Sequence, residues 1–382
     1  MSKHWPTVQL GTVLTQSTEY ISAPEPREYR KLSVKLYGKG VVLDAPVDGT
    51  TLKMQRHQLA KTGQIILSEI WGKKGAIGFV PPEGDGALCT NHFFLFDARA
   101  DKLDRRWLKA IFDANFLQEQ LDAEARGTTG YAAVRPRILL ACEIPLPPLA
   151  DQRRLVARIE ELAAQIGEAR TLRQQAVEEA EELCRSIIMT DTEPTPTALR
   201  ELVRLRRPDV EVQAQESYQF AGVYCFGRGV FRGDCKTGLD FAYSRLTTLR
   251  SGNFVYPKLM AWEGAFGVVP NECDGCVVST EFPVFEIDET KVYHEVLDTF
   301  FRMPSVWPEI SGASTGTNVR RRRLNPQDFL AYKLPLPSRA TQHRLRQVRA
   351  QVSALKRLQA ETAAELDALL PAVLDRAFKG EL

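Results

Sequence analysis

The most constraining feature of this 382-residue sequence is an internal duplication at about half its length. Repeated blocks of sequence mean repeated structural units, and they limit how the rest of a chain can fold. Markers recur in the same order at an offset of 189 residues; they are Leu10 and Leu199, Tyr29 and Tyr218, Tyr37-Gly-Lys-Gly40 and Phe226-Gly-Arg-Gly229, Gly75-Ala-Ile-Gly78 and Gly264-Ala-Phe-Gly267, and Gly127-Thr and Gly316-Thr. At an offset of 190, Ile144-Pro-Leu-Pro147 and Gln152 recur as Leu334-Pro-Leu-Pro337 and Gln342. The chain therefore consists of two copies of a unit of about 190 residues.

The first copy ends in a segment whose pattern predicts a long helix. No proline occurs from Asp151 to Met189, and eight acids and six bases lie between Asp151 and Arg185. Apolar residues follow steps of four and three at Leu155, Ile159, Leu162, Ile166, Ala169, Ala176, Ala180, Leu183 and Ile187. A seam with this period of 3.5 residues is typical of a coiled coil. About 38 residues correspond to a rod of roughly 57 Å.

The second copy predicts a similar helix from about Thr341. Its apolar positions are Leu345, Val348, Val352, Leu355, Leu366, Leu369 and Val373. Pro371 should interrupt or kink this helix near its end, because proline lacks the backbone N–H of a helical residue. Neither helix can hide its apolar seam alone, so the two are expected to pair, running antiparallel.

The remainder of each copy predicts a small globule of mixed structure. Runs such as Gln64–Leu67 and His92–Phe96 combine β-branched, aliphatic and aromatic residues between turn residues, which is typical of strands. The predicted fold class is α+β, with two globules, two long antiparallel coiled-coil helices and a pseudo-two-fold internal repeat. The predicted divisions are a first globule at 1–145, a central helix at 146–190, a second globule at 191–335 and a C-terminal helix at 336–382.

A proline-rich motif, Pro145-Leu-Pro-Pro-Leu-Ala-Asp-Gln-Arg-Arg154, follows a Gly-Thr loop and leads into the first long helix. The chain finishes with Phe378-Lys-Gly-Glu-Leu382 after a second long helix. Over its whole length the sequence resembles the specificity (S) subunits of type I restriction–modification systems. The resemblance implies that each globule is a target-recognition domain, which reads one half of a split site in double-stranded DNA. It also implies that the paired helices set the spacer between the half-sites.

The resemblance further implies a set of partners and a role in phage defence. Two methyltransferase subunits would dock on the helices, carry S-adenosylmethionine and flip the target adenine out of the duplex. Motor-nuclease subunits would join for restriction, whereas this chain would have no catalytic residues, no cofactor and no metal of its own. The residues expected to dock the methyltransferase are Gln152, Arg153, Arg154 and Gln342. The second copy departs from the motif, since Thr341-Gln-His-Arg344 stands where Asp151–Arg154 stands in the first.

The candidate DNA contacts lie in loops of the two globules. Gly72-Lys-Lys-Gly75 lacks the Gly-Lys-Ser/Thr ending of a nucleotide-binding loop, so it predicts a tight strand turn. Small and hydroxyl-bearing residues let a backbone approach phosphates, and arginines can grip phosphate or guanine. The candidates are Lys73 and Lys74 at this turn, Arg126, Thr128 and Thr129 in the first Gly-Thr loop, and Thr315, Thr317, Asn318, Arg320, Arg321, Arg322 and Arg323 in and after the second.

Four of the seven cysteines raise the question of a zinc site. Cys225, Cys235, Cys273 and Cys276 all lie in the second globule, and the last two have zinc-knuckle spacing around an Asp-Gly turn. The first globule has only Cys89 and Cys142, which excludes a site shared by both copies. Ordinary buried thiols are favoured over zinc.

Charge and composition indicate a non-secreted protein without a strongly basic face. The net charge is +2, with nineteen bases and sixteen acids in residues 1–150 and eighteen bases and nineteen acids in 191–340, so any DNA surface must be local. The N-terminal residues contain no apolar signal-peptide core, which favours a cytoplasmic location. No Asn-Pro-Pro-aromatic run or nuclease-like cluster occurs, as expected for a non-catalytic reader.

Two alternative functions stay open from the sequence. The chain could serve as the specificity subunit of a type II enzyme in which restriction and methylation are fused. It could instead be a coiled-coil interaction scaffold whose globules bind protein.

Overall fold

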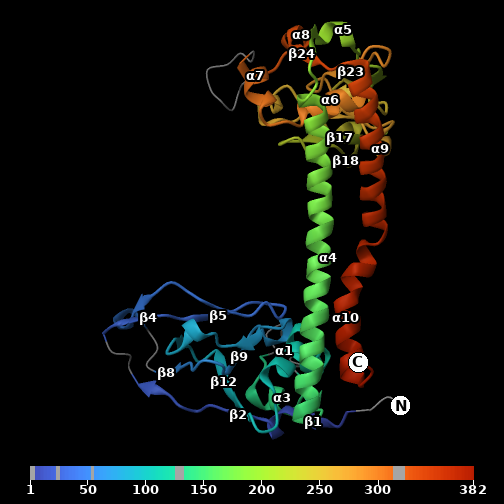
Figure 1. Cartoon of the computed structure of the whole chain (residues 1–382). Coiled ribbons are helices and arrows are strands. Elements are labelled where there is room, and N and C mark those ends of the chain that lie inside the picture. Colours follow the sequence, from blue (N-terminus) through green and yellow to red (C-terminus); the bar gives the residue numbers. More distant parts are fainter. Residues whose placement is uncertain (1–4, 23–25, 53–55, 125–132, 313–322) are drawn as a thin grey trace. The chain divides into compact units, whose positions relative to one another are not determined.

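The computed structural model describes residues 5–22, 26–52, 56–124, 133–312 and 323–382 (Figure 1). It divides into two compact units. Unit 1 comprises residues 1–171 and 362–382, and unit 2 comprises residues 172–361. This division differs from the predicted one, which separated the long helices from the globules. The reason is that each stretch of long helix contributes side chains to the core of the globule on which it packs.

The described residues of unit 1 form short strands and three small helices beside the long-helix segments. The strands are β1 (Thr7–Gln9), β2 (Leu14–Gln16), β3 (Ile21–Ser22), β4 (Glu28–Tyr29), β5 (Leu32–Val34), β6 (Val41–Leu43), β7 (Val47–Asp48), β8 (Arg56–Leu59), β9 (Ile65–Ser68), β10 (Ile77–Phe79), β11 (Leu88–Cys89), β12 (Phe93–Ala98) and β13 (Glu143–Pro145). The helices are α1 (Arg105–Asp113), α2 (Gln118–Glu124) and α3 (Pro136–Ala141). The central antiparallel sheet has the order β10-β9-β12-β2, and β9 is buried along its whole length.

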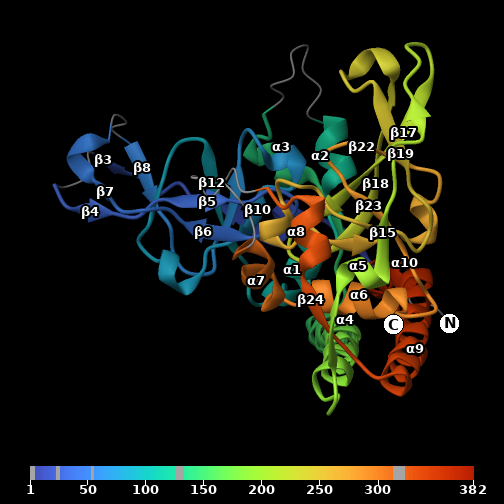
Figure 2. The same cartoon turned by 90° about the horizontal axis from the view of Figure 1, so that it is seen from above.

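Unit 2 repeats this plan, with a longer hairpin, β17–β18, in place of the β5–β6 hairpin. Its strands are β14 (Thr195–Ala198), β15 (Val203–Leu205), β16 (Val210–Glu211), β17 (Ser217–Tyr224), β18 (Gly229–Thr237), β19 (Arg245–Thr248), β20 (Phe254–Val255), β21 (Gly267–Val268), β22 (Val277–Ser279), β23 (Val284–Ile287) and β24 (Lys333–Leu336). Its helices are α5 (Leu199–Leu202), α6 (His294–Phe301), α7 (Val306–Gly312) and α8 (Pro326–Ala331). The order β15-β23-β20-β21 matches the central sheet of unit 1, and Figure 2 shows the β17–β18 hairpin beside it.

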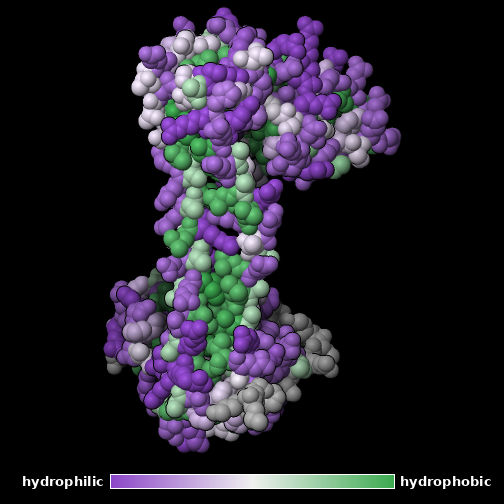
Figure 3. All heavy atoms as spheres, turned by 45° about the vertical axis from the view of Figure 1, so that its right-hand side comes forward, coloured by the Kyte–Doolittle hydropathy of each residue, from purple (hydrophilic) through white to green (hydrophobic). Residues whose placement is uncertain are grey.

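The long helices are α4 (Leu149–Met189), α9 (Arg339–Glu361) and α10 (Ala363–Lys379). In unit 1, α4 runs antiparallel to α10, and Arg170 pairs with Asp367 at 2.8 Å. Figure 3 shows hydrophobic side chains gathered along this pair. In unit 2, α4 runs antiparallel to α9, and Glu181 pairs with Arg349 at 2.8 Å and with Lys356 at 2.6 Å. The predicted α+β class with antiparallel helix pairs is therefore confirmed within each unit.

Two predicted seam positions are wrong by one residue. Leu183 and Leu369 are exposed, whereas their neighbours Cys184 and Leu370 pack into the cores of unit 2 and unit 1. A helix with 3.6 residues per turn drifts by about 20° per heptad against a strict 3.5-residue repeat. The apolar face has therefore moved to the next residue by the end of each helix.

The helix break predicted at Pro371 lies elsewhere. Helix α9 ends at Glu361 and α10 begins at Ala363, while Pro371 lies inside α10. Pro371 is exposed, so the carbonyl that loses its helical hydrogen bond can be hydrated. No helix among the described residues has the length and apolar character needed to cross a membrane.

The core of unit 1 depends on the last turns of α10. Phe378 lies edge-on to Trp107 of α1, with ring centroids 5.3 Å apart, and makes a similar contact with Phe116. The indole N–H of Trp107 donates to the carbonyl of Pro145 at 2.9 Å. Leu374 and Ala377 are buried in the same core. The C-terminal helix is therefore part of the first globule's core rather than an appendage.

We predict that Phe378→Ala lowers the free energy of unfolding of unit 1 by about 3 kcal/mol, because it leaves a cavity against Trp107. The matched control is Leu369→Ala on the exposed face of α10, with an expected change within about 0.5 kcal/mol. Peptide-resolved hydrogen exchange measures both, and the peptides of unit 2 serve as an internal reference. Equal protection of unit 1 in the two variants would contradict this packing.

Candidate nucleic-acid interface

Each unit contains two turns that are hydrogen-bonded to one another in the same way. In unit 1, the N–H of Tyr37 donates to the carbonyl of Lys74 at 2.7 Å, and that of Gly38 donates to Gly75 at 3.0 Å. In unit 2, Phe226 and Gly227 make the same bonds to Glu263 and Gly264, at 2.7 and 3.0 Å. These are the motifs that revealed the duplication. Their recurrence therefore has a structural basis, which is a pair of turns held edge to edge.

The predicted lysine turn is a single 3-10 turn, Gly72–Lys74, between β9 and β10. It ends at Gly75, whose φ of 68° lies in the left-handed region that glycine tolerates. Lys74 lies with its Nζ 5.2 Å from the ring centroid of Trp71, a cation–π contact. The tight turn is therefore confirmed, and Lys73 and Lys74 stay predictions as DNA contacts.

Most of the other predicted DNA contacts lie outside the described residues. They are Arg126, Thr128, Thr129, Thr315, Thr317, Asn318, Arg320, Arg321 and Arg322. The elements around these two segments correspond between the units. Helix α2 precedes 125–132 and α3 follows it, while α7 precedes 313–322 and α8 follows it. Helix α2 packs against the Gly72–Lys74 turn, and α7 packs against the equivalent turn, Ala261–Glu263.

Arg323 is the one predicted contact of the second Gly-Thr segment that the structure describes. Its guanidinium forms an ion pair with Glu281, and Lys258 lies 3.8 Å from the same carboxylate. All three side chains are partly exposed. To bind a phosphate, Arg323 would have to break its ion pair with Glu281 or contact both groups at once. Its role as a DNA contact stays a prediction.

Gln152 and Gln342, two of the residues predicted to dock a partner, have buried side chains that bond within their own units. Gln152 is 0% exposed and Gln342 is 2% exposed. The Gln152 amide accepts a hydrogen bond from the N–H of Asp104 at 2.8 Å and donates to the carbonyls of Lys102 and Pro147, at 2.9 and 2.8 Å. These bonds fix the start of α4 to the residues that enter α1.

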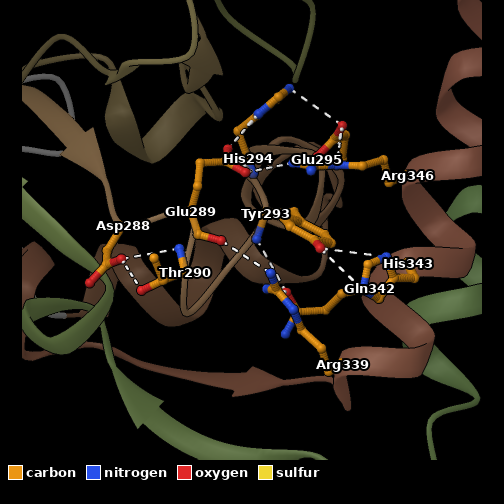
Figure 4. Close-up of polar contacts among 10 residues, drawn as sticks. All are labelled: Asp288, Glu289, Thr290, Tyr293, His294, Glu295, Arg339, Gln342, His343 and Arg346. Atoms are coloured by element: carbon orange, nitrogen blue, oxygen red, sulfur yellow. Dashed lines mark hydrogen bonds and ion pairs between the residues drawn. The ribbon is translucent and has the colours of Figure 1, made fainter.

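Gln342 makes the equivalent bonds in unit 2. Its amide accepts from the N–H of Tyr293 at 3.2 Å and donates to the carbonyl of Pro337 at 3.0 Å. Figure 4 shows this amide at the centre of a polar cluster where α9 meets α6. The sequence carried a usable signal for this role, because a glutamine recurs five residues after the last proline of both Pro-Leu-Pro runs.

Two arginines of α9 enclose the ring of Tyr293 in this cluster. The guanidinium carbons of Arg339 and Arg346 lie 3.7 and 3.3 Å from the ring centroid, and the ring of His343 lies edge-on to it (Figure 4). Arg346 also pairs with Glu295 at 3.0 Å and with Glu289 at 2.5 Å. Hydrogen bonds from His294 and Arg346 hold the pKa of the Glu289 carboxyl below its usual value, against the opposing effect of burial. The departure of the second copy from the Asp-Gln-Arg-Arg motif therefore creates a different but complete anchor.

Arg153 and Arg154 are exposed and remain candidates for partner docking. Arg153 lies 3.7 Å from Asp104, and Arg154 lies 3.4 Å from Asp151. Arg153 also lines a surface cavity of about 520 Å³ with Arg105, Arg106 and Lys109. This part of unit 1 thus presents a concave, basic surface at the start of α4.

The four cysteines considered for a zinc site do not form one cluster. Cys273 and Cys276 are buried among the apolar residues of a small core, whereas Cys235 is exposed. Burial raises the pKa of the Cys273 thiol to about 11, which disfavours the thiolate that a zinc site needs. Among the described residues, no group of three or more His, Cys, Asp or Glu side chains is arranged to hold a metal ion. The two thiols pack as small apolar side chains.

We predict that Gln152→Ala lowers the free energy of unfolding of unit 1 by about 1–3 kcal/mol, because it strands the N–H of Asp104 and two carbonyls. Gln342→Ala should have the same effect on unit 2. The control is Arg154→Ala, because Arg154 is exposed and takes no part in the hydrogen bonds of Gln152. It should leave protection from hydrogen exchange unchanged. A Gln152→Ala variant with native protection but impaired partner binding would restore the docking role.

Comparison with known proteins gives a structural match without a sequence match. No family model matches the chain, and no curated protein matches it. The HsdS subunit from Thermoanaerobacter tengcongensis matches with a TM-score of 0.61 and 24% identity, over 99% of this chain and 97% of that one. A chain from a study of complex assembly and conformational transition of the type I restriction–modification system matches with a TM-score of 0.69 and 23% identity, over 99% and 98%. The chain therefore has the fold of the HsdS specificity subunits of type I restriction–modification systems.

Proposed function

We propose that this chain is the DNA-recognition subunit of a type I restriction–modification complex in the cytoplasm. The observation that carries the proposal is the match to HsdS over 99% of the chain, together with an internal duplication whose two units keep the same turns and the same helix anchors. Such a duplicated architecture suits a ligand that is itself bipartite.

Each globule would read one half of a split DNA site. The two units share the turn pairs and the buried glutamines, but their loops differ in sequence, for example Ala125-Arg-Gly-Thr-Thr-Gly130 against Ser314-Thr-Gly-Thr-Asn318. Two domains that recognise different half-sites need the same framework and different DNA-contacting loops. The recognised site would therefore be asymmetric and gapped.

The long helices would set the spacer and dock two methyltransferase subunits. Helix α4 is continuous over 41 residues, which corresponds to about 60 Å. The exposed Arg153 and Arg154 at its start would contribute to docking. The methyltransferase subunits would carry S-adenosylmethionine and the catalytic residues, and motor-nuclease subunits would join them for restriction. This chain would supply recognition only, without catalytic residues, cofactor or metal of its own.

The proposal predicts a methylated bipartite motif in the host genome that depends on this gene. Long-read modification sequencing of host DNA, with the gene intact and deleted, tests it. Loss of the motif on deletion, with restoration by the gene in trans, is the expected result. Methylation that persists unchanged while the host's methyltransferase is expressed would contradict the proposal and favour the scaffold alternative.

A further inference from the structure

Each unit exposes a small apolar patch at the paired turns. In unit 1 the patch consists of Tyr37, Ile70 and Trp71, whose exposed fractions are 60%, 42% and 48%. In unit 2 it consists of Phe226, Leu259 and Met260, at 64%, 40% and 37%. Each residue of one patch is offset by 189 from its counterpart in the other. No other exposed large hydrophobic residue in the described part of the chain has an exposed large hydrophobic counterpart at this offset.

The patches are built structures, because the backbone ties their parts together. The bonds from Tyr37 to Lys74 and from Phe226 to Glu263 hold the aromatic turn against the 3-10 turn. Within the 3-10 turns, the carbonyls of Trp71 and Met260 each accept hydrogen bonds from two later N–H groups, at 2.8 and 3.2 Å in unit 1 and at 3.0 and 3.3 Å in unit 2. The two turns that carry the exposed aromatic and apolar residues are therefore held edge to edge in each unit.

The aromatic residues occupy an unfavourable backbone conformation. Tyr37 has φ 59° and Phe226 has φ 62°, and besides Asn115 they are the only non-glycine residues with positive φ in the described part of the chain. A bulky residue in the left-handed region is strained by roughly 1 kcal/mol or more, whereas glycine is not. Both copies have an aromatic residue at this position despite the strain. Because the side chain is largely exposed, it contributes little hydrophobic stabilisation to the fold. A role at the surface accounts for that.

We infer that the two patches pack against the DNA duplex, with Tyr37 and Phe226 as aromatic contacts to the sugars or the base stack beside each half-site. The inference rests on the proposed function and extends it to named residues. Aromatic and aliphatic side chains contact these features without reading sequence. A contact of this kind can be the same in two units that read different sequences.

The surroundings of the patches favour DNA over a protein partner. Each aromatic residue is followed in sequence by glycine, a cation and glycine, so both hairpin tips carry a positive charge, at Lys39 and at Arg228. The guanidinium of Arg228 lies over the ring of Tyr224, 4.7 Å from its centroid. In unit 1, Lys73 and Lys74 add positive charge, and Lys74 lies over Trp71. In unit 2 the corresponding residues are Trp262 and Glu263, so the equivalent turn carries no lysine. The 3-10 turns also pack against α2 and α7, the helices that lead into the two Gly-Thr segments. The patches therefore border the loops expected to contact DNA.

The decisive variants are Tyr37→Gly and Phe226→Gly. Glycine removes the ring and also relieves the positive-φ strain, so hydrogen exchange should show stability equal to or above that of the wild type. Affinity for DNA should nevertheless fall about 5- to 50-fold for each variant, the range expected for one lost aromatic contact. The loss should be similar on a duplex with the methylated site and on a scrambled duplex, because the contact is sequence-independent.

The assay is fluorescence anisotropy with the full chain, alone and with the host's methyltransferase subunit. Tyr37→Phe and Phe226→Tyr should retain wild-type affinity, and Leu239→Ala, an exposed apolar residue outside the patches, is the neutral control. Unchanged DNA affinity in both glycine variants would overturn the inference while leaving the proposed function intact. Loss of methyltransferase co-elution, with DNA binding by the chain alone unchanged, would also overturn it and assign the patches to a protein partner. A wild-type complex that binds neither duplex would instead contradict the proposed function.

Discussion

The fold depends on how the ends of the long helices are fixed to the globules. At the start of α4 and of α9, a buried glutamine accepts the backbone N–H of a residue that enters a globule helix and donates to a carbonyl of the Pro-Leu-Pro run. Such bonds are stronger inside a protein than in water, and an unmet buried donor is costly. The amides therefore determine where each helix starts and how it meets its globule.

Apolar packing also holds the long helices to the globules. Helix α10 places Leu374, Ala377 and Phe378 in the core of unit 1, and α9 places Leu345 and Val352 in the core of unit 2. In unit 2, Glu181 of α4 also pairs with both Arg349 and Lys356. Those two cations hold the pKa of Glu181 below its usual value although burial opposes them, so its charge stabilises the helix pair near neutral pH. Helix and globule therefore share one core in each unit.

The duplication, the fold class and the helix pairing could be predicted from the sequence. The duplication is visible as repeated motifs, and the helices as a regular spacing of apolar residues. Seam positions far along a helix could not be predicted, since drift of the apolar face shifted Leu183 and Leu369 to the surface. The charged neighbours of Gln152 pointed to the surface, whereas its recurrence as Gln342 was the signal for a structural role, and its partner at the start of α1 lies 48 residues away in sequence. The strain at Tyr37 and Phe226 is a tertiary effect, imposed by hydrogen bonds to a turn about 37 residues later.

The central claim is that the two units are equivalent readers, each responsible for one half of the site. A chain in which residues 1–145 are replaced by a second copy of 191–335 tests this most directly, with long-read modification sequencing as the measurement. The account predicts a new methylated motif made of two copies of the half-site that unit 2 reads. A folded chimera that still directs methylation to the original first half-site would contradict it.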